Sequence, residues 1–307
     1  MHAGIFALVS QNRKFPFPEL LTTMEENRAS STALGVAKVR AFHQMMDADP
    51  KILADPVILR LLGEAIADEI RANGRLAREE RFAAFRGHIV LRNRYAEDCL
   101  GEAEGRGTRQ YVLLGAGYDT FAYRQPAWAQ ALTIFEVDHP ASQVAKRKLL
   151  AAAGVAVPRN LRFAAVNFEF DSLKDGLQAA GLDFTRPAFF SCLGVLVYLE
   201  EEAIAQLFAC IAKMARGSEF VFTFSQPESA LDEKDAASRA KITAKVSEMG
   251  EPWQSYFEPE RLEEVLLDAG FSSVTFLTPE VAAEKYFRGR KDALKAPKRV
   301  RIGRAMV

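Results

Sequence analysis

The chain has 307 residues, 49% of them hydrophobic, and its 40 basic and 40 acidic side chains give a formal net charge of zero. This length and apolar content are ample for a sizeable core, as one large domain or two small ones. Because the charge is balanced, we expect neither nucleic acid nor a membrane surface as the main partner.

The first third of the chain is predicted to be helical. Residues 1–28 are expected to be irregular. Ser30 is a typical helix N-cap before a run with helical apolar spacing, and Asp55-Pro56 predicts a second helix start. A third, highly charged helix is expected over residues 77–102. We therefore interpret residues 1–108 as an N-terminal helical cap.

Short apolar runs alternate with helical segments from residue 110 onward. Strands are expected near 110–115, 132–138, 161–166, 188–193 and 219–224, and helices near 140–153, 172–180 and 200–216. Strands and helices that alternate at this spacing predict an α/β fold with a parallel sheet. In the first of these helices, Lys146, Arg147 and Lys148 are interpreted as a solvated face.

The alternation stops after Ser225. A polar helical stretch follows, and we interpret residues 226–256 as an insertion. Beyond it the pattern predicts a helix over 259–269 and two strand-like runs, 271–276 and 300–307. Residues 109–307 are thus expected to form one domain with a helical insertion.

The most informative motif is Tyr111-Val-Leu-Leu-Gly-Ala-Gly-Tyr-Asp-Thr120, in which an apolar strand runs into Gly115 and Gly117. Glycines at such a turn allow a sharp bend and let a ligand approach the main chain. The next predicted strand ends in an acid, Asp138. Doubly wound sheets bind nucleotides with a glycine-rich first turn and an acid that takes the ribose hydroxyls.

Two residues of the turn indicate which nucleotide fits. Thr120 occupies the place where the dinucleotide fingerprint has its third glycine. Asp119 adds negative charge where a pyrophosphate would lie, which repels phosphate but suits a cationic ligand such as a sulfonium. The sequence therefore favours S-adenosylmethionine over NAD.

Other kinds of site find little support. Cys99, Cys192 and Cys210 are scattered and lack a C-x-x-C pattern, which is typical of reduced core residues in a cytoplasmic protein. The histidines show no metal-ligand spacing, so no metal site is predicted. There is neither a signal-peptide pattern nor an apolar run long enough to span a bilayer. We expect a cytoplasmic protein.

Several further stretches complete a pattern that runs over roughly residues 30–307. They are Thr32-Ala-Leu-Gly35, Arg92-Asn-Arg-Tyr-Ala-Glu-Asp98, Leu113-Leu-Gly-Ala-Gly-Tyr-Asp-Thr-Phe-Ala-Tyr-Arg124, Phe135-Glu-Val-Asp-His-Pro140, Val166-Asn-Phe-Glu169, Phe190-Ser-Cys-Leu-Gly-Val195 with Tyr198, and Gly250-Glu-Pro-Trp253. With them the chain resembles the leucine carboxyl methyltransferase family, especially its bacterial branch of S-adenosylmethionine-dependent O-methyltransferases. The resemblance implies a Rossmann-like class I methyltransferase sheet of seven strands, the last antiparallel, behind the N-terminal cap.

The resemblance also implies a cofactor site. One arginine of the pair Arg92 and Arg94 would hold the methionine carboxylate, and Asp138 would bind both ribose hydroxyls. The full set of predicted cofactor-binding residues is Arg92, Arg94, Gly115, Ala116, Gly117, Asp119, Asp138, Asn167, Phe168 and Leu193.

Three residues depart from the pattern of the family. Asn167 stands where relatives usually have Asp; its amide keeps a hydrogen-bond acceptor for the adenine amine but adds an NH2 group that the carboxylate lacks. Leu193 and Cys192 stand where relatives carry Glu and Trp, at the expected wall around the methyl group. Tyr198 and Tyr256 are the candidate catalytic residues.

The function that the resemblance implies is transfer of a methyl group to a carboxylate or hydroxyl of a small molecule. The absence of a general-base motif favours a carboxylate or an acidic phenol, because these are already ionised. The alternatives are a non-catalytic S-adenosylmethionine-binding protein, an NAD(P)-dependent oxidoreductase, and a protein C-terminus as acceptor. We expect the cap and the insertion to close together over the acceptor. The sequence gives no indication of the oligomeric state.

Overall fold

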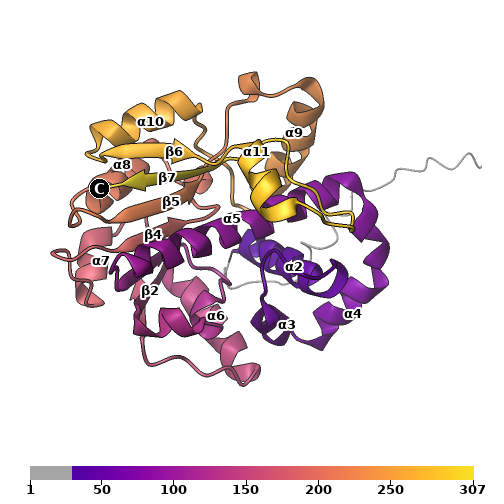
Figure 1. The fold of residues 1–307 in the computed structure, drawn as a ribbon, viewed down its shortest axis with the longest axis horizontal. Coiled ribbons are helices and arrows are strands. Elements are labelled where there is room, and N and C mark those ends of the chain that lie inside the picture. Colours follow the sequence, from indigo (N-terminus) through magenta and orange to yellow (C-terminus); the bar gives the residue numbers. More distant parts are fainter. Residues whose placement is uncertain (1–29) are drawn as a thin grey trace, which may run out of the picture.

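A computed structural model describes residues 30–307, and its centre is a seven-stranded sheet in the order β3-β2-β1-β4-β5-β7-β6 (Figure 1). The strands are β1 (Gln110–Leu114), β2 (Thr133–Asp138), β3 (Leu161–Ala165), β4 (Phe189–Cys192), β5 (Glu219–Thr223), β6 (Ser273–Phe276) and β7 (Ile302–Met306). The first five strands pair in parallel, whereas β7 runs antiparallel to β5 and β6. The predicted Rossmann-like methyltransferase sheet is thereby confirmed. The expectation for residues 1–28 lies outside the described residues.

The central strands owe their position to continuous apolar runs. Strands β1, β4 and β5 are buried at every residue, as expected for parallel strands covered on both faces. The strand order reverses between β1 and β4, which are neighbours in space but not in sequence. In open parallel sheets the crevice beyond the carboxyl ends of such strands is the usual ligand site.

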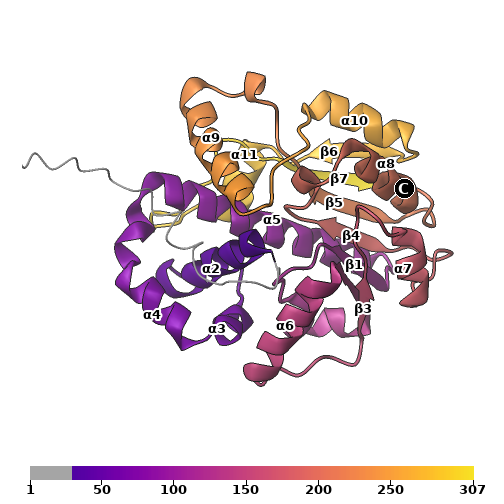
Figure 2. The same ribbon diagram turned by 180° about the vertical axis from the view of Figure 1, so that it is seen from behind.

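Helices cover both faces of the sheet (Figure 2). Alternate residues of β1 point to opposite faces: Val112 and Leu114 contribute to one hydrophobic cluster, and Tyr111 and Leu113 to another. The first cluster is completed by α7 (Leu173–Ala179), α8 (Glu201–Ile211) and α10 (Pro259–Asp268), and the second by the C-terminal half of α5 (Glu80–Gly105). Helix α6 (Pro140–Ala152) connects β2 to β3.

The N-terminal helices pack around a third cluster beside the sheet. They are α2 (Ser31–Met46), α3 (Pro56–Leu62), α4 (Glu64–Ala72) and the first half of α5. Both predicted N-caps are confirmed, since Ser30 Oγ accepts from Ala33 N at 3.0 Å and Asp55 Oδ1 accepts from Ile58 N at 3.2 Å. Helix α5 contributes to the cap core with its first half and to the sheet core with its second, so one rigid element joins the two parts.

The insertion forms a long helix, α9 (Glu233–Glu248), between β5 and α10. A short helix α11 (Pro279–Ala282) and a π turn (Ala283–Phe287) precede the segment that leads into β7. The remaining short helical turns are η1 (Gly74–Arg78), η2 (Phe121–Tyr123), η3 (Ala127–Ala131), η4 (Leu196–Tyr198) and η5 (Glu228–Ala230). Figures 1 and 2 show α9 and α11 above the N-terminal helices, at the same end of the sheet.

The glutamate that follows α9 fastens the insertion to the cap. Glu251 accepts hydrogen bonds from Ser30 Oγ (2.9 Å) and Ser31 N (2.9 Å), at the exposed N–H groups of the first turn of α2. A carboxylate at this place also interacts favourably with the helix dipole. Two segments that are far apart in the sequence thus meet at one edge of the cavity described below.

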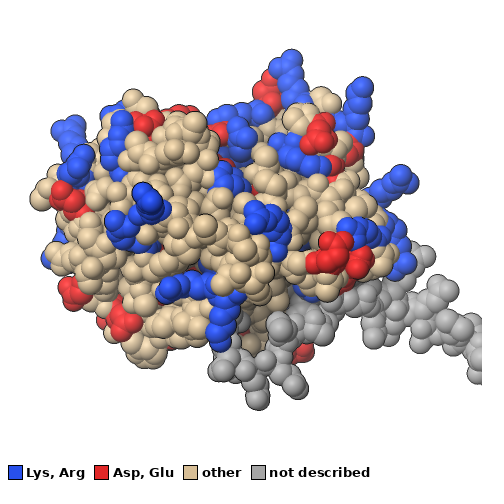
Figure 3. Space-filling view, turned by 90° about the horizontal axis from the view of Figure 1, so that it is seen from below, with Lys and Arg blue, Asp and Glu red and all other residues tan. Residues whose placement is uncertain are grey.

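One interpretation of the surface was wrong. Lys146 is buried, and its Nζ lies 2.8 Å from Glu136 Oε2, so it forms an internal ion pair between α6 and β2 instead of a solvated position. Glu136 stands within a buried strand, which is why it needs a cation from the covering helix. On the face drawn in Figure 3, the Lys and Arg side chains stand singly or in small groups, with acidic side chains among them.

Candidate active site

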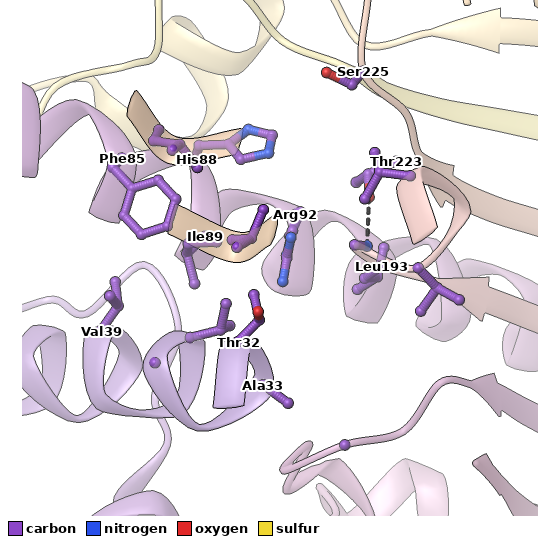
Figure 4. A pocket seen from close by; sticks show the side chains of 18 of the residues that line it. Thr32, Ala33, Val39, Phe85, His88, Ile89, Arg92, Leu193, Thr223 and Ser225 are labelled. Carbon is purple, nitrogen blue, oxygen red and sulfur yellow. Dashed lines mark hydrogen bonds between the residues drawn. The ribbon is translucent and has the colours of Figure 1, made fainter. Parts of the chain in front are cut away.

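A cavity of about 1220 Å³ opens at the carboxyl ends of β1 and β4, where the strand order reverses. Its walls come from the glycine-rich turn, α2, α5, α9 and the segment before β7. Figure 4 shows side chains of α2, α5 and the ends of β4 and β5 converging on this space. The position is the one that the topology of an open α/β sheet predicts for a ligand site.

The glycine-rich turn needs glycine at two positions. Gly115 has φ +66°, and a Cβ there would lie 2.3 Å from Cγ2 of Val195. Gly117 has φ +42°, and its N–H donates to Asp138 Oδ2 at 2.5 Å. Positive φ angles and the contact with Val195 explain why the sequence has glycines here. The bare turn and the carboxylate at the end of β2 therefore form one wall of the cavity.

Asp138 is held in place by backbone donors. Its Oδ1 accepts from His139 N at 2.7 Å, in addition to the bond from Gly117. Burial raises the pKa of Asp138, although these two N–H groups act in the opposite direction. His139 itself caps α6, because its Nδ1 accepts from Ala141 N at 3.2 Å. The carboxylate is thus positioned before any ligand arrives.

Asp119 also lines the cavity, on the loop after the glycines. Its Oδ1 accepts from Phe121 N at 2.7 Å and its Oδ2 accepts from Asn93 Nδ2 at 3.1 Å. The negative charge expected in this turn is therefore fixed near the cavity by α5 and by the loop itself.

Arg92 reaches the cavity from α5 beside Gly194. Gly194 has φ +77°, and a Cβ on it would lie 2.6 Å from Arg92 Nη1, so a side chain there would displace the guanidinium. The Nε of Arg92 is buried and has no hydrogen-bond partner among the described residues. Burial lowers the pKa of Arg92 to about 10. A buried guanidinium with an unsatisfied donor is costly unless an anion binds to it.

Polar groups of three elements meet next to Arg92. Burial raises the pKa of Tyr198, while the nearby side chains of Trp253 and Thr32 partly offset this effect. Thr32 Oγ1 and Trp253 Nε1 are buried, and neither makes a hydrogen bond of good geometry within the described chain. Because the raised pKa keeps the Tyr198 hydroxyl protonated, this group can donate a hydrogen bond but is a poor general base.

His88 is a cavity residue that was not among the predicted site residues. It lies on the face of α5 that also carries Phe85, Ile89 and Arg92, and all four line the cavity (Figure 4). Burial, and then the charges of Arg92 and Arg301, lower the pKa of His88 to about 3. The spacing of these residues, at i, i+3, i+4 and i+7, is the signal by which they could have been found.

The structure brings most of the predicted cofactor-binding residues together. Those that line the cavity are Arg92, Gly115, Ala116, Gly117, Asp119, Asp138, Phe168 and Leu193, with Tyr198 as candidate catalytic residue. The neighbour Glu169, which the prediction omitted, lines it too. Cys192 is buried in the sheet core instead, and burial raises the pKa of its thiol to about 12.

Three predicted residues lie elsewhere. Arg94 is exposed and its Nε donates to Asp98 Oδ1 at 2.8 Å. Tyr256 is exposed and its ring lies 5.3 Å from the guanidinium of Arg239, outside the cavity lining. Asn167 does not line the cavity either, since its Oδ1 accepts from Glu169 N and shapes the loop after β3.

The described part of the chain has neither a candidate metal site nor a helix that could span a membrane. Within residues 30–307 there is no group of His, Cys, Asp or Glu side chains suited to hold a metal ion. The helices of this part are all too short or too polar to cross a bilayer. The three cysteines are free.

The sequence matches a known family over the region that builds this cavity. The sequence model of the family "Leucine carboxyl methyltransferase" matches residues 33–212. YktD of Bacillus subtilis, by name an S-adenosyl-L-methionine-dependent methyltransferase, is 32% identical over 89% of this chain and 96% of its own length. The chain therefore belongs to the leucine carboxyl methyltransferase family of S-adenosylmethionine-dependent methyltransferases.

One further relative and one solved structure are similar to this chain. A Mycobacterium tuberculosis protein with the same kind of name, Rv0281, is 34% identical over 60% of this chain and 62% of its own length. A DUF574 family protein of Streptomyces avermitilis has a similar fold, with a TM-score of 0.50 and 16% identity over 88% of this chain and 96% of its own. At that identity the likeness concerns the fold alone.

Proposed function

We propose that this protein is an S-adenosylmethionine-dependent O-methyltransferase that acts on a carboxylate or hydroxyl of a small molecule. The observation that carries the proposal is Arg92, whose buried Nε has no partner in the described chain and faces the same cavity as Asp138. The guanidinium of Arg92 suits a methionine carboxylate, and the carboxylate of Asp138 suits ribose hydroxyls. Family membership supports the same cofactor.

The residues present fit this cofactor. Gly115 and Gly117 leave the main chain bare for its amino-acid end, and Phe168 offers an apolar surface for the adenine. Asp119 places a negative charge near the turn, which suits a sulfonium and would repel a pyrophosphate. When bound, S-adenosylmethionine supplies a methyl group on a positively charged sulfur.

The contribution of the protein is positioning and exclusion of water. Arg92 and Asp138 hold the two ends of the cofactor, and Glu251 fastens the insertion to α2 along the cavity edge. The hydroxyls of Tyr198 and Thr32 and the indole N–H of Trp253 are available to orient an acceptor oxygen. A carboxylate needs no general base, which agrees with the protonated state of Tyr198 and with the low pKa of His88.

Calorimetric titration with S-adenosylhomocysteine tests the cofactor. We expect binding of this ligand, no binding of NADP in a parallel titration, and loss of S-adenosylhomocysteine binding in Asp138→Ala. Binding of NADP alone would overturn the proposal and favour an oxidoreductase.

Methyl-labelled S-adenosylmethionine tests the reaction. The protein is incubated with the fraction of a bacterial extract below 1 kDa, as a rough size limit for ligands that fit a pocket of this class, and in parallel with the protein fraction. Label should enter the small molecules, as a base-labile ester or a base-stable ether. Label on nitrogen or sulfur, or only in the protein fraction, would contradict the proposal.

A further inference from the structure

The cavity wall at the glycine-rich turn carries two carboxylates, Asp119 and Asp138, and both are half-buried. Asp119 accepts hydrogen bonds from a backbone N–H and from the amide of Asn93, and Asp138 accepts from two backbone N–H groups. Neither carboxylate forms an ion pair with a basic side chain of residues 30–307. Neutral dipoles therefore hold the two negative charges, without a counter-ion from the described chain. We call this pair the carboxylate wall.

The basic side chains nearest to the carboxylate wall have partners of their own. The charge of Lys146 reaches the carboxylate at the end of β2, but its Nζ pairs with Glu136 Oε2 at 2.8 Å. Arg40 also lines the cavity, and it pairs with Asp55 at 3.1 Å. Arg92 is different, because its buried Nε has no partner among the described residues, and the proposed function assigns it to the methionine carboxylate of the cofactor.

Asp119 lies between the groups assigned to the two ends of the cofactor. Its Oδ2 accepts from Asn93, which follows Arg92 on α5, and two positions before it stands Gly117, whose N–H donates to Asp138. Burial lowers the pKa of Arg92 to about 10, and the charge of Asp119 acts in the opposite direction, so the two groups are within electrostatic reach of each other. In S-adenosylmethionine the sulfur joins the methionine part to the ribose. A cofactor held at both ends therefore has its sulfur on the side of Asp119.

A count of charges shows which form of the cofactor this wall favours. The carboxylate wall and Arg92 together carry two negative charges and one positive charge. S-adenosylmethionine has one carboxylate, one ammonium and one sulfonium, so its excess positive charge balances the site. S-adenosylhomocysteine has a neutral sulfur and leaves one carboxylate uncompensated, which is unfavourable in a partly buried place.

We propose that Asp119, positioned by Asn93, recognises the positive charge on the cofactor sulfur and makes the protein bind S-adenosylmethionine more tightly than S-adenosylhomocysteine. This inference rests on the proposed function. In methyl transfer the new C–O bond forms with an electron pair of the acceptor oxygen, and the electron pair of the broken C–S bond stays on sulfur, which becomes neutral; a hydroxyl acceptor also releases its proton to water. The attraction to Asp119 ends at that step, and the loss favours release of the product.

Calorimetric titration of the whole protein with three ligands, in the absence of an acceptor, tests the preference. S-adenosylmethionine carries the charge, and so does sinefungin, in which a carbon with an ammonium group replaces the methylated sulfur; S-adenosylhomocysteine lacks it. We expect both charged ligands to bind about tenfold more tightly than S-adenosylhomocysteine, because a unit charge a few ångströms from a carboxylate near a protein surface contributes at least this much.

The outcomes separate this inference from the proposed function. Binding of S-adenosylhomocysteine as tightly as the charged ligands, or more tightly, would overturn the inference and leave the proposed cofactor intact. Absence of binding by all three ligands would overturn the proposed function and the inference with it.

Variants assign the preference to one carboxylate. Asp119→Asn keeps the size of the side chain and an oxygen that accepts from Phe121 N, so we expect the ratio of the two dissociation constants, for S-adenosylhomocysteine and S-adenosylmethionine, to fall from about ten to about one. Asn93→Leu removes the amide that positions Asp119 and should also lower the ratio, although no charge is lost. A ratio that compares two ligands in one variant does not respond to a general loss of folded protein.

Asp268→Asn is the control, because it removes an exposed carboxylate of α10 outside the cavity and should leave the ratio at its native value. A ratio that stays near ten in Asp119→Asn would contradict the role of Asp119. A native ratio in Asn93→Leu would contradict the positioning role of Asn93.

Discussion

The Thr120 hydroxyl donates a hydrogen bond of 2.6 Å to Asp55 Oδ1, and this contact joins the glycine-rich turn to the helical cap. Both side chains are completely buried. Asp55 also caps α3 and accepts from Arg40 Nε at 3.1 Å, while Arg40 Nη2 donates to the carbonyl of Tyr118. The position that holds glycine in dinucleotide-binding turns is thus used here to tie the turn to the cap.

Removal of this hydroxyl should destabilise the fold. Thr120→Val keeps the shape of the side chain but leaves Asp55 without one donor, so we expect the free energy of unfolding to fall by about 1–3 kcal/mol. Urea denaturation measures the change. Thr185→Val is the matched control, because the Thr185 hydroxyl bonds to Asp183 at an exposed site and its loss should stay within about 0.5 kcal/mol. A Thr120→Val protein of native stability would mean that the contact contributes nothing.

Substitutions of Arg92 and Asp138 should have different effects on the binding of two ligands. Arg92→Met should weaken S-adenosylhomocysteine by about ten- to a hundredfold, the usual range for a hydrogen bond to a charged group, and leave adenosine unaffected because adenosine lacks the methionine carboxylate. Asp138→Asn should weaken both ligands, since both contain the ribose. Calorimetry with the two ligands measures the difference. Arg94→Met, at the exposed ion pair with Asp98, should change neither affinity.

Arg92→Met should weaken cofactor binding but should not lower the stability of the unliganded protein. The native protein without ligand buries a guanidinium whose Nε is unsatisfied, and a methionine of similar length removes this cost. The unliganded variant should therefore be as stable as the native protein or more stable. A clear loss of stability in Arg92→Met would show that this arginine supports the fold and is not held ready for a ligand.

The stability of the protein should depend on pH through His88. Its pKa in the folded state is about 3, below the ordinary value of 6.5, so between these values the unfolded chain binds a proton that the folded chain does not. The contribution is complete above pH 6.5 and is lost progressively as the pH falls toward 3, by at most about 1.4 kcal/mol per pH unit. Thermal unfolding of the native protein and His88→Gln from pH 7.5 to 4 measures it. Parallel curves for the two proteins would contradict the prediction.

Glu251 should control how firmly the insertion closes the cavity. Glu251→Ala removes the acceptor of Ser30 Oγ and Ser31 N, so we expect faster cleavage of residues 226–256 in limited proteolysis and less protection by S-adenosylhomocysteine. Loss of these hydrogen bonds at the start of α2 should also lower stability by about 0.5–1.5 kcal/mol, although Ser30 still caps the helix. Glu248→Ala, an exposed residue at the end of α9, is the control. Equal cleavage rates in native protein and Glu251→Ala would argue against closure by this contact.

Local sequence patterns were enough to predict the elements that depend on local chemistry. Largely apolar runs predicted the five parallel strands, because the central strands are buried on both faces and therefore consist mainly of apolar residues. Ser30 and Asp55-Pro56 predicted two helix starts, since N-caps are local features. The glycine-rich turn and Asp138 predicted where a ligand site would lie, because the carboxyl ends of parallel strands meet at one edge of the sheet.

Which side chains reach the cavity depends on how the helices pack against the sheet. Arg92 and Arg94 look alike in a charged helix, but packing of α5 against the sheet turns the first inward and leaves the second in solvent. The same rotation brings His88 into the cavity, and the return of the chain into β7 brings the charge of Arg301 close enough to act on it. Three adjacent basic residues predict a solvated helix face at Lys146, whereas the docking of α6 on β2 pairs this side chain with Glu136. Helix rotation and long-range docking depend on the packing of the whole chain, and a local sequence pattern does not contain that information.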